Sequence, residues 1–421
     1  MNNIHSYPLE SSASLDRLLD MAAQSRVVML GEATHGTHQF YTWRSLISRR
    51  LIDEKGFSFI AVEGDWPDCY LINRFVKGYE DAGERILDIL KGFDRWPTWM
   101  WANWEIAAFG AWLRNFNSNI AKEQRTGFYG LDVYSLWDSM HAIVPYLQKE
   151  DPSAVKAVKA AISCFEPYGE EGLNYARAAF HLSNSCRDKA LVLLREIRKK
   201  MPAYDTDKEA AFSAEQNARI VVNAEEYYSS MIGLDANSWN IRDSHMMETL
   251  DHLLEFTGGK GIVWAHNSHV GDARATPMAR SGTVNIGQLA RQQYGQKQVF
   301  LLGFATYEGN VIASREWGAP MEMMEVPPSR KGSIEDLLHH QFNSDQLLFL
   351  KKEPEGFDHV LPHRAIGVVY HPEREKSGNY VPSLLPSRYD ALIYLDKTNA
   401  LHPLHLKPND EKMPETYPFG L

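Results

Sequence analysis

Cysteine is scarce in this chain of 421 residues, which contains only three. They are Cys69, Cys164 and Cys186, an odd number at wide separations. A disulfide framework or a zinc ribbon needs paired or closely spaced cysteines, so this pattern predicts neither. The scarcity is typical of a reducing compartment, and we expect a cytoplasmic protein.

Positive charge is also in deficit. The chain has 44 Lys and Arg against 54 Asp and Glu, which gives a formal net charge of −10. Binding of DNA or RNA depends on clustered cations that displace counterions from the phosphates, and no dense basic tract occurs here. The sequence therefore predicts no nucleic-acid partner.

Long hydrophobic runs are missing as well. A membrane-spanning helix needs about 20 apolar residues, whereas the longest run here, residues 299–305, is the length of a strand. The N-terminal residues lack the basic segment and apolar stretch of a signal peptide. We expect a soluble protein with no membrane partner, and no feature indicates an oligomeric state.

Several short catalytic motifs do not occur. The chain has no Gly-x-Ser-x-Gly, which carries the serine of α/β-hydrolases, and no His-Glu-x-x-His of zinc peptidases. It also has no Walker loop and no Gly-x-Gly-x-x-Gly that would hold a nucleotide. The sequence therefore predicts no cofactor.

What the sequence does contain is an alternation of strands and helices. Residues 27–30, 57–62 and 127–133 are short β-branched or aromatic runs, each followed by a break and a segment with helical spacing. This alternation predicts an α/β fold with a central, mostly parallel sheet flanked by helices. The first helix should cover about residues 37–52 and end at Lys55-Gly56.

The middle of the chain has a different pattern. Residues 136–256 show helical periodicity without a convincing strand, which predicts a large helical insertion. Further strands are predicted at 261–265, 298–305, 365–369 and 391–395, and a long loop at 372–388. The predicted division is 1–135 and 258–421 for the two parts of the α/β core and 136–257 for the insertion.

Acid and base groups follow the predicted strands. In an open α/β sheet, ligands bind beyond the carboxyl ends of the strands, so the residues there are the first candidates for a site. The groups in question are Glu32 and His35 with Arg44 in the following helix, Glu63 and Asp65, Asp132, and His266 with His269.

These residue types suit hydrolysis by an activated water. His35 is the candidate base, because a histidine whose other ring nitrogen is held by a carboxylate can take a proton from water. Glu32 or Glu63 is the candidate carboxylate. Arg44 could hold a substrate carboxylate or an oxyanion. His266 and His269 could donate to the leaving group or the oxyanion.

Two other interpretations apply to the same residues. Each of them alone could be a helix cap or a loop contact, and we prefer that structural role for His38 and Asp65. Alternatively, His266, His269, Glu32 and Glu63 could bind zinc or manganese if they converge. The sequence does not separate a metal-held water from a histidine-activated one.

The chain resembles the erythromycin esterase family, whose members are also often labelled succinoglycan biosynthesis proteins. The resemblance covers about residues 15–403. It is carried by four motifs: Gly31-Glu32-Ala33-Thr34-His35-Gly36 with Arg44, Val62-Glu63-Gly64-Asp65-Trp66-Pro67, Trp264-Ala265-His266-Asn267-Ser268-His269, and Arg364-Ala365-Ile366-Gly367.

The resemblance implies an α/β core with added helices and metal-independent hydrolysis of an ester or lactone. Within it, His35 would be the base and Glu32 the acid of the same loop, while Arg44, Glu63, His266 and His269 would complete the polar cluster. The best-known substrate of the family is a macrolide ring, which makes a role in antibiotic resistance one expectation. The expected partner is therefore a small-molecule ester or lactone.

There are two main alternatives to such an esterase, one that is also an enzyme and one from another class. One is a metal-dependent hydrolase that uses the same His and Glu cluster. The other is a non-catalytic protein that binds a polysaccharide or small molecule, with some of the 11 Trp stacking on sugar rings. Tryptophans buried throughout the protein would count against this last possibility.

Overall fold

The computed structural model describes residues 5–405 except 170–171, 183–184, 201–206, 232–236 and 351–355. Its strands are β1 (His5–Pro8), β2 (Val27–Leu30), β3 (Phe57–Asp65), β4 (Gly127–Asp132), β5 (Lys260–Trp264), β6 (Val299–Ser314), β7 (Met321–Val326), β8 (Gln346–Phe349), β9 (Leu361–Arg364), β10 (Tyr380–Ser383) and β11 (Ala391–Thr398). Its α-helices are α1 (Asp16–Ala22), α2 (His38–Lys55), α3 (Trp66–Val76), α4 (Ile86–Leu90), α5 (Trp104–Ser118), α6 (Leu136–Glu150), α7 (Val155–Phe165), α8 (Gly172–Leu182), α9 (Arg187–Lys200), α10 (Lys208–Ser230), α11 (Asn237–Thr257), α12 (Asn267–Val270), α13 (Ile286–Tyr294), α14 (Ile334–Phe342), α15 (Glu375–Gly378) and α16 (Leu385–Arg388).

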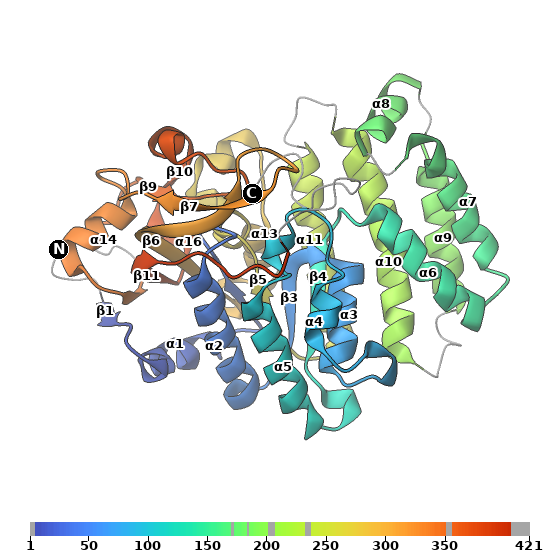
Figure 1. The fold of residues 1–421 in the computed structure, drawn as a ribbon, viewed down its shortest axis with the longest axis horizontal. Coiled ribbons are helices and arrows are strands. Elements are labelled where there is room, and N and C mark those ends of the chain that lie inside the picture. Colours follow the sequence, from blue (N-terminus) through green and yellow to red (C-terminus); the bar gives the residue numbers. More distant parts are fainter. Residues whose placement is uncertain are drawn as a thin grey trace.

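A nine-stranded sheet forms the centre of the molecule (Figure 1). Its order is β1-β8-β11-β6-β2-β5-β3-β4, and β7 pairs with the distal part of β6. The strands from β11 to β4 are parallel to one another. At one edge, β8 pairs antiparallel with β11, and β1 pairs antiparallel with β8. The predicted α/β fold with a mostly parallel sheet is therefore confirmed.

Both faces of the sheet are covered, because side chains alternate across each strand. On β2, Val28 and Leu30 join one core with α1, α2 and α5, while Val27 and Met29 join a second core with α11 and α13. All of β2 is buried, as expected of a central parallel strand.

Helix α2 shows how the sequence sets these boundaries. Its apolar positions, among them Phe40, Ile47 and Leu51, are buried against the sheet. The helix ends at Gly56, whose φ of 70° places it in the left-handed region that favours glycine at a helix C-terminus. The predicted end at Lys55-Gly56 is thus confirmed.

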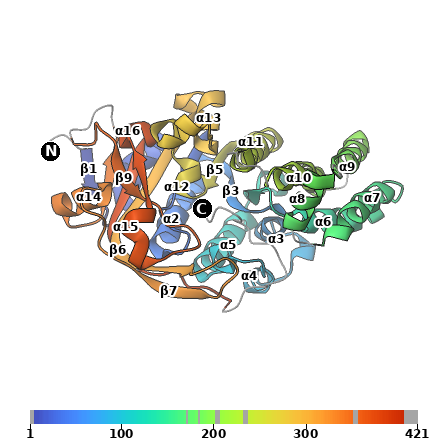
Figure 2. The same cartoon turned by 90° about the horizontal axis from the view of Figure 1, so that it is seen from above.

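Helices α6 to α10 pack around a core of their own, which includes Met140, Leu147, Val158, Leu193 and Val221. They lie at the side of the molecule opposite β1 and α14 (Figures 1 and 2). Helix α11 instead packs on the sheet through Met246 and Leu250. The division into 1–135, 136–257 and 258–421 stays a prediction.

Some expectations about the C-terminal part are wrong. Residues 365–369 form isolated bridges to Thr34 and Ser314 instead of a strand. Residues 372–388 are not a long loop, because they contain α15, β10 and α16. These short elements pair or pack with distant segments, and local periodicity does not report such contacts.

The cysteines also differ from expectation. Cys164 and Cys186 form a disulfide, with Cα atoms 5.9 Å apart, between the end of α7 and the start of α9. Cys69 is a buried free cysteine. The two cysteines are 22 residues apart in the sequence, and the packing of two helices brings them together, so their spacing did not predict the disulfide. The cytoplasmic location stays a prediction. In the described part of the chain, no helix is both long and apolar enough to cross a membrane.

Candidate active site

The strand order brings the predicted polar groups to one edge of the sheet. β5 lies between β2 and β3 with parallel pairing on both sides, and β4 follows β3. The carboxyl ends of β2, β5, β3 and β4 are therefore neighbours. They carry the loop of Glu32 and His35, the loop of His266 and His269, then Glu63, and finally Asp132.

Gly31 allows the first two loops to approach closely. A Cβ atom at Gly31 would lie 2.1 Å from Oδ1 of Asn267, far inside van der Waals contact. The amide of Asn267 also bonds the backbone of Phe304, through Nδ2 to its carbonyl at 2.7 Å. Any side chain at position 31 would thus push the His266 loop away from the Glu32 loop.

His35 is held by a carboxylate on one ring nitrogen. Its Nδ1 lies 2.9 Å from Oε1 of Glu32, and both side chains are buried. The other oxygen of Glu32 accepts from Nη2 of Arg44 at 2.6 Å. Since the second oxygen of Glu32 accepts from Arg44, the carboxylate is also the acceptor for Nδ1 of His35, which leaves Nε2 as the ring nitrogen available to accept a proton.

Arg44 is fully buried beneath this pair. Its guanidinium lies 4.5 Å and 4.9 Å from the ring centroids of Tyr41 and Trp264. Arg44 thus holds the oxygen of Glu32 that does not contact His35. This position suits a positioning residue, while Nε and Nη1 of Arg44 have no hydrogen-bond partner among the described residues, so its role in binding a substrate stays a prediction.

His266 presents the opposite tautomer. It caps α12, and its Nδ1 accepts a hydrogen bond from the backbone N–H of Ser268 at 3.2 Å. The proton of the neutral ring is therefore on Nε2. Burial, together with the neighbouring His35, lowers the pKa of His266 well below its ordinary value, so the ring stays neutral.

The two imidazoles face each other, with ring centroids 4.9 Å apart. Neither Nε2 atom makes a hydrogen bond of good geometry among the described residues, although both are buried and the backbone of Ala33 lies close to the ring of His266. One is an acceptor on His35 and the other a donor on His266. A buried acceptor and donor without partners are costly to folding and typical of a site that receives a ligand.

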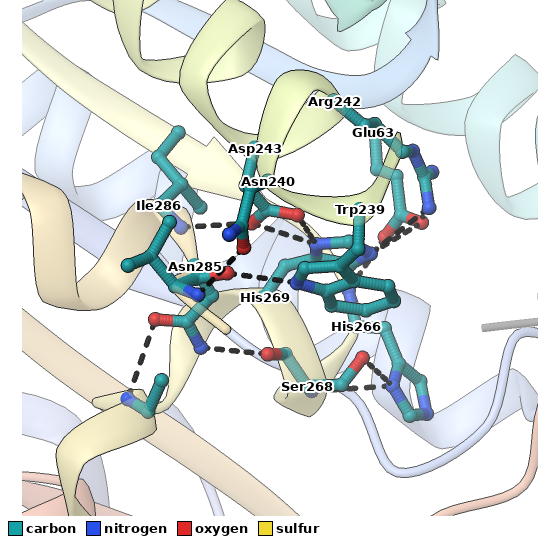
Figure 3. A network of polar contacts seen from close by, with 12 residues as sticks. Glu63, Trp239, Asn240, Arg242, Asp243, His266, Ser268, His269, Asn285 and Ile286 are labelled. Atoms are coloured by element: carbon teal, nitrogen blue, oxygen red, sulfur yellow. Dashed lines mark hydrogen bonds and ion pairs between the residues drawn. The ribbon is translucent and has the colours of Figure 1, made fainter. Parts of the chain in front are cut away.

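Glu63 belongs to an adjoining network of charges (Figure 3). One oxygen of Glu63 accepts from the backbone N–H of His266 at 2.8 Å, and the other from Nη2 of Arg242 at 2.7 Å. Arg242 also bonds both oxygens of Asp132, at 3.0 and 2.7 Å. Glu63 therefore fixes the backbone at His266, whereas Glu32 holds the imidazole of His35.

His269 completes this network, and its Nε2 lies 3.1 Å from Nη1 of Arg242. Its Nδ1 lies 2.9 Å from Asp243, its Nε2 lies 3.4 Å from Glu63, and its ring stacks on Trp239 (Figure 3). Burial alone would lower its pKa, but the charges of Asp243 and Glu63 raise the pKa of His269 to about 9. The pKa of Glu63, despite its burial, is held well below its ordinary value by His269 and Arg242.

The comparisons with known proteins identify the family. The profile of the erythromycin esterase family matches residues 52–398. The chain belongs to the erythromycin esterase family. The chain is similar to an erythromycin esterase type II of Escherichia coli, at 22% identity over 92% of this chain and 96% of that protein. It is 21% identical to a putative hydrolase, YbfO, of Bacillus subtilis (strain 168), over 93% of this chain and 89% of that one.

Solved structures show the same fold. A crystal structure described as a succinoglycan biosynthesis protein aligns with a TM-score of 0.78 at 20% identity, over 94% of this chain and 95% of that chain. A Bacillus cereus protein aligns with a TM-score of 0.79 at 20% identity, over 95% and 97% of the two chains. A mutant of the erythromycin esterase EreC in its open conformation aligns with a TM-score of 0.66 at 15% identity, over 93% and 95%. The family descriptions and the curated relatives support a hydrolase.

Not all predicted groups share one role in this member of the erythromycin esterase family. Asp65 is bonded to Arg95 at 3.0 Å, a pairing that fits the structural role preferred for it. The four candidate metal ligands, His266, His269, Glu32 and Glu63, are engaged with protein donors and with one another. In the part of the chain that is described, the group of His, Cys, Asp and Glu side chains whose ligand atoms gather closely enough for a metal is a different one, His38, Glu105 and His402.

The sequence missed the residues that α11 contributes. Arg242, Asp243 and Trp239 project from this helix onto Glu63, Asp132 and His269 (Figure 3). These residues do not follow a predicted strand, since the sequence predicts only another helix of the helical insertion there. The adjacent Arg-Asp pair next to a tryptophan was the one hint, because charges at buried helix positions need buried partners.

We expect the stability of the fold to fall between pH 7 and pH 9. The folded-state pKa of His269 is raised from 6.5 to about 9, so its stabilisation is complete below pH 6.5 and is lost as the pH rises through about 9. The loss should be on the order of 3 kcal/mol. Denaturant unfolding at a series of pH values measures it. A His269→Gln variant should be less stable at pH 7 and lack this slope, and an equal slope in the variant would contradict the assignment.

Proposed function

We propose that the protein hydrolyses an ester or lactone by means of a water that His35 deprotonates, without a metal ion. The observation that carries the proposal is a pair of neighbouring buried imidazoles, with ring centroids 4.9 Å apart, each with an Nε2 atom that lacks a hydrogen bond among the described residues. Their opposite tautomers are set by different partners, Glu32 and the backbone of Ser268. Membership of the erythromycin esterase family supports the same class of reaction.

The proposed reaction balances with these two side chains. His35 Nε2 takes a proton from water while the water oxygen attacks the carbonyl carbon. The N–H of His266 donates to the oxyanion that forms, and Glu32 stabilises the imidazolium of His35. When the tetrahedral intermediate collapses, His35 returns the proton to the leaving alkoxide. The products are a carboxylic acid and an alcohol.

A metal-held water is less well supported by the same residues. Glu32 is shared between His35 and Arg44, and Glu63 is bonded to Arg242 and the backbone of His266. Both carboxylates therefore already have cationic or N–H partners that a metal would have to displace. The proposal keeps them as positioning residues.

A binding protein that stacks sugars on its tryptophans is also less well supported. All 11 Trp lie in the described part of the chain, and the one exposed Trp is Trp104, at 54%. The largest buried side chains include Trp66, Trp96, Trp99 and Trp101. These rings form core and give no stacking surface.

Both catalytic candidates are closed off from solvent, since His35 and His266 have no exposed surface. A substrate carbonyl can reach them only when neighbouring segments move apart. The solved EreC mutant is described as being in an open conformation, so an open state is named for one relative. We propose that this chain also opens to admit its substrate.

The experiment that tests the proposal is a substrate screen with protein purified without a His tag and treated with a chelator. The panel contains p-nitrophenyl esters, simple lactones and a macrolide. Hydrolysis of at least one compound that persists after chelation supports the proposal. Activity that is lost on chelation and restored by metal would overturn it, as would the absence of turnover across the panel.

His266→Phe should lower kcat for the best substrate by about 10²- to 10³-fold, because the ring then lacks the donor for the oxyanion. KM should change little, since the donor acts mainly in the transition state. His266→Gln can still donate from its amide and should recover part of the rate. Steady-state kinetics on variants with unchanged circular dichroism provide the measurement. An unchanged kcat in His266→Phe would remove His266 from the mechanism.

A further inference from the structure

A second cluster of histidine and carboxylate lies outside the catalytic site. Glu105, in the first turn of α5, accepts at Oε1 from Nδ1 of His38 at 2.5 Å and from Nδ1 of His402 at 2.6 Å. His38 is the first residue of α2, and His402 follows β11. Three segments far apart in the chain thus converge on one carboxylate oxygen.

We propose that His38, Glu105 and His402 bind a divalent transition-metal ion, with zinc as the first candidate. Two imidazoles and one carboxylate are a ligand set that zinc accepts, and a three-ligand site keeps one position open. The ligand atoms all lie within 4.8 Å of one another. A tetrahedral site with metal–ligand bonds near 2.0–2.1 Å separates its ligand atoms by roughly 3.3 Å. The two Nδ1–Oε1 separations, 2.5 and 2.6 Å, would therefore need to widen by less than about 1 Å.

Glu105 has one carboxylate oxygen that is available to a cation. Oε2 of Glu105 is buried and has no hydrogen-bond partner among the described residues, although the side chain is only 4% exposed. A metal would satisfy this oxygen or its neighbour and release the protons that the two Nδ1 atoms carry.

Backbone hydrogen bonds connect the three segments that carry the proposed ligands. His38 N–H donates to Asn399, and Trp104 N–H donates to the carbonyl of His402 itself. The bridge between Asn103 and Pro403 adds a further tie. The C-terminal segment is thus fixed beside α2 and α5 before any ion binds, which lowers the entropy cost of binding.

An open coordination position has room beside it. The three ligands line a cavity of about 340 Å³ together with Thr42, Ser45 and Trp104. His402 is 61% exposed at its side chain and His38 is 32% exposed, so an ion can enter from solvent. The proposal does not rest on hydrolase activity, because none of these residues belongs to the His35 and His266 pair.

Metal analysis tests the site directly. Untagged protein is stripped with a chelator, dialysed against Zn²⁺, and assayed for bound zinc and for its dissociation constant by competition with a chromogenic chelator. We expect one zinc per chain and a rise in Tm with zinc. His402→Ala should weaken binding at least tenfold and remove the Tm shift, since the exposed His402 can be replaced without disturbing the core.

Two controls keep the result specific. His339→Ala removes a half-buried histidine that pairs with Asp396 at 2.7 Å outside the cluster, and it should leave zinc affinity unchanged. Cobalt in place of zinc should give the visible absorption of a tetrahedral nitrogen and oxygen site in the wild type and lose it in His402→Ala. Absence of stoichiometric binding, or equal affinity in wild type and His402→Ala, would overturn the proposal.

Discussion

Replacing His35 by glutamine is expected to lower kcat for ester hydrolysis by at least about 10⁴-fold, the scale on which loss of a general base acts in comparable hydrolytic sites. Nε2 of His35 has no hydrogen-bond partner among the described residues and belongs to a ring next to that of His266, and an amide offers no base in its place. The amide can still donate to Glu32, so the buried carboxylate keeps a partner and the fold should persist.

The measurement is the initial rate on the best substrate of the panel, with circular dichroism and Tm as checks of folding. His363→Gln is the matched control, because His363 is an equally buried histidine whose Nδ1 lies 2.8 Å from Glu335. It should lose comparable stability and keep its turnover within about tenfold of wild type. A folded His35→Gln protein with a rate within tenfold of wild type would eliminate His35 as the base.

Arg242→Met is expected to lower the free energy of unfolding by about 3–5 kcal/mol, the largest stability effect that the structure suggests. Arg242 is fully buried and neutralises both Glu63 and Asp132, which are themselves 1% exposed. Without the guanidinium, Glu63 would keep its contact with His269, and Asp132 would lose the ion pair that Arg242 makes with it. Removing one partner of a buried ion pair leaves the other charge without compensation, which is why the cost is so much larger than the value of the pair itself.

Denaturant unfolding at pH 7 measures this loss. The triple variant Arg242→Met, Glu63→Gln and Asp132→Asn removes all three charges and should regain part of the stability. As a surface control, Arg85→Met breaks an exposed pair with Asp88 at 3.8 Å and should cost less than about 1 kcal/mol. A cost for Arg242→Met no larger than that of the surface control would contradict the structural assignment.

The part of the site that the sequence predicted is the part that lies at strand ends. Glu32, Glu63 and His266 lie at or just after the apolar run of a strand, and His35 lies three residues beyond Glu32 in the same loop, so parallel pairing brings these segments together. The choice between Glu32 and Glu63 as the partner of His35 required the structure. Both follow strands, and which carboxylate reaches the ring depends on side-chain direction and not on order along the chain.

Arg242 and Asp243 were beyond prediction for a different reason. They lie on a helix, where burial is decided by the element packed against it, and no local pattern says that α11 lies over the ends of β3 and β5. The cluster of His38, Glu105 and His402 joins residues separated by the length of the chain. Cys164 and Cys186 likewise meet only because α7 and α9 pack side by side.

The position of β5 has a consequence for how the chain folds during synthesis. β2 and β3 are made early but do not pair with each other, because the place between them belongs to residues 260–264. Until those residues leave the ribosome, each strand has a free edge, and free edges are sites at which chains associate wrongly. The helices from α6 to α11 are synthesised in that interval. The protein therefore has to protect the edges of β2 and β3 that face this gap until β5 arrives, and the His266 loop of the proposed catalytic pair arrives with it.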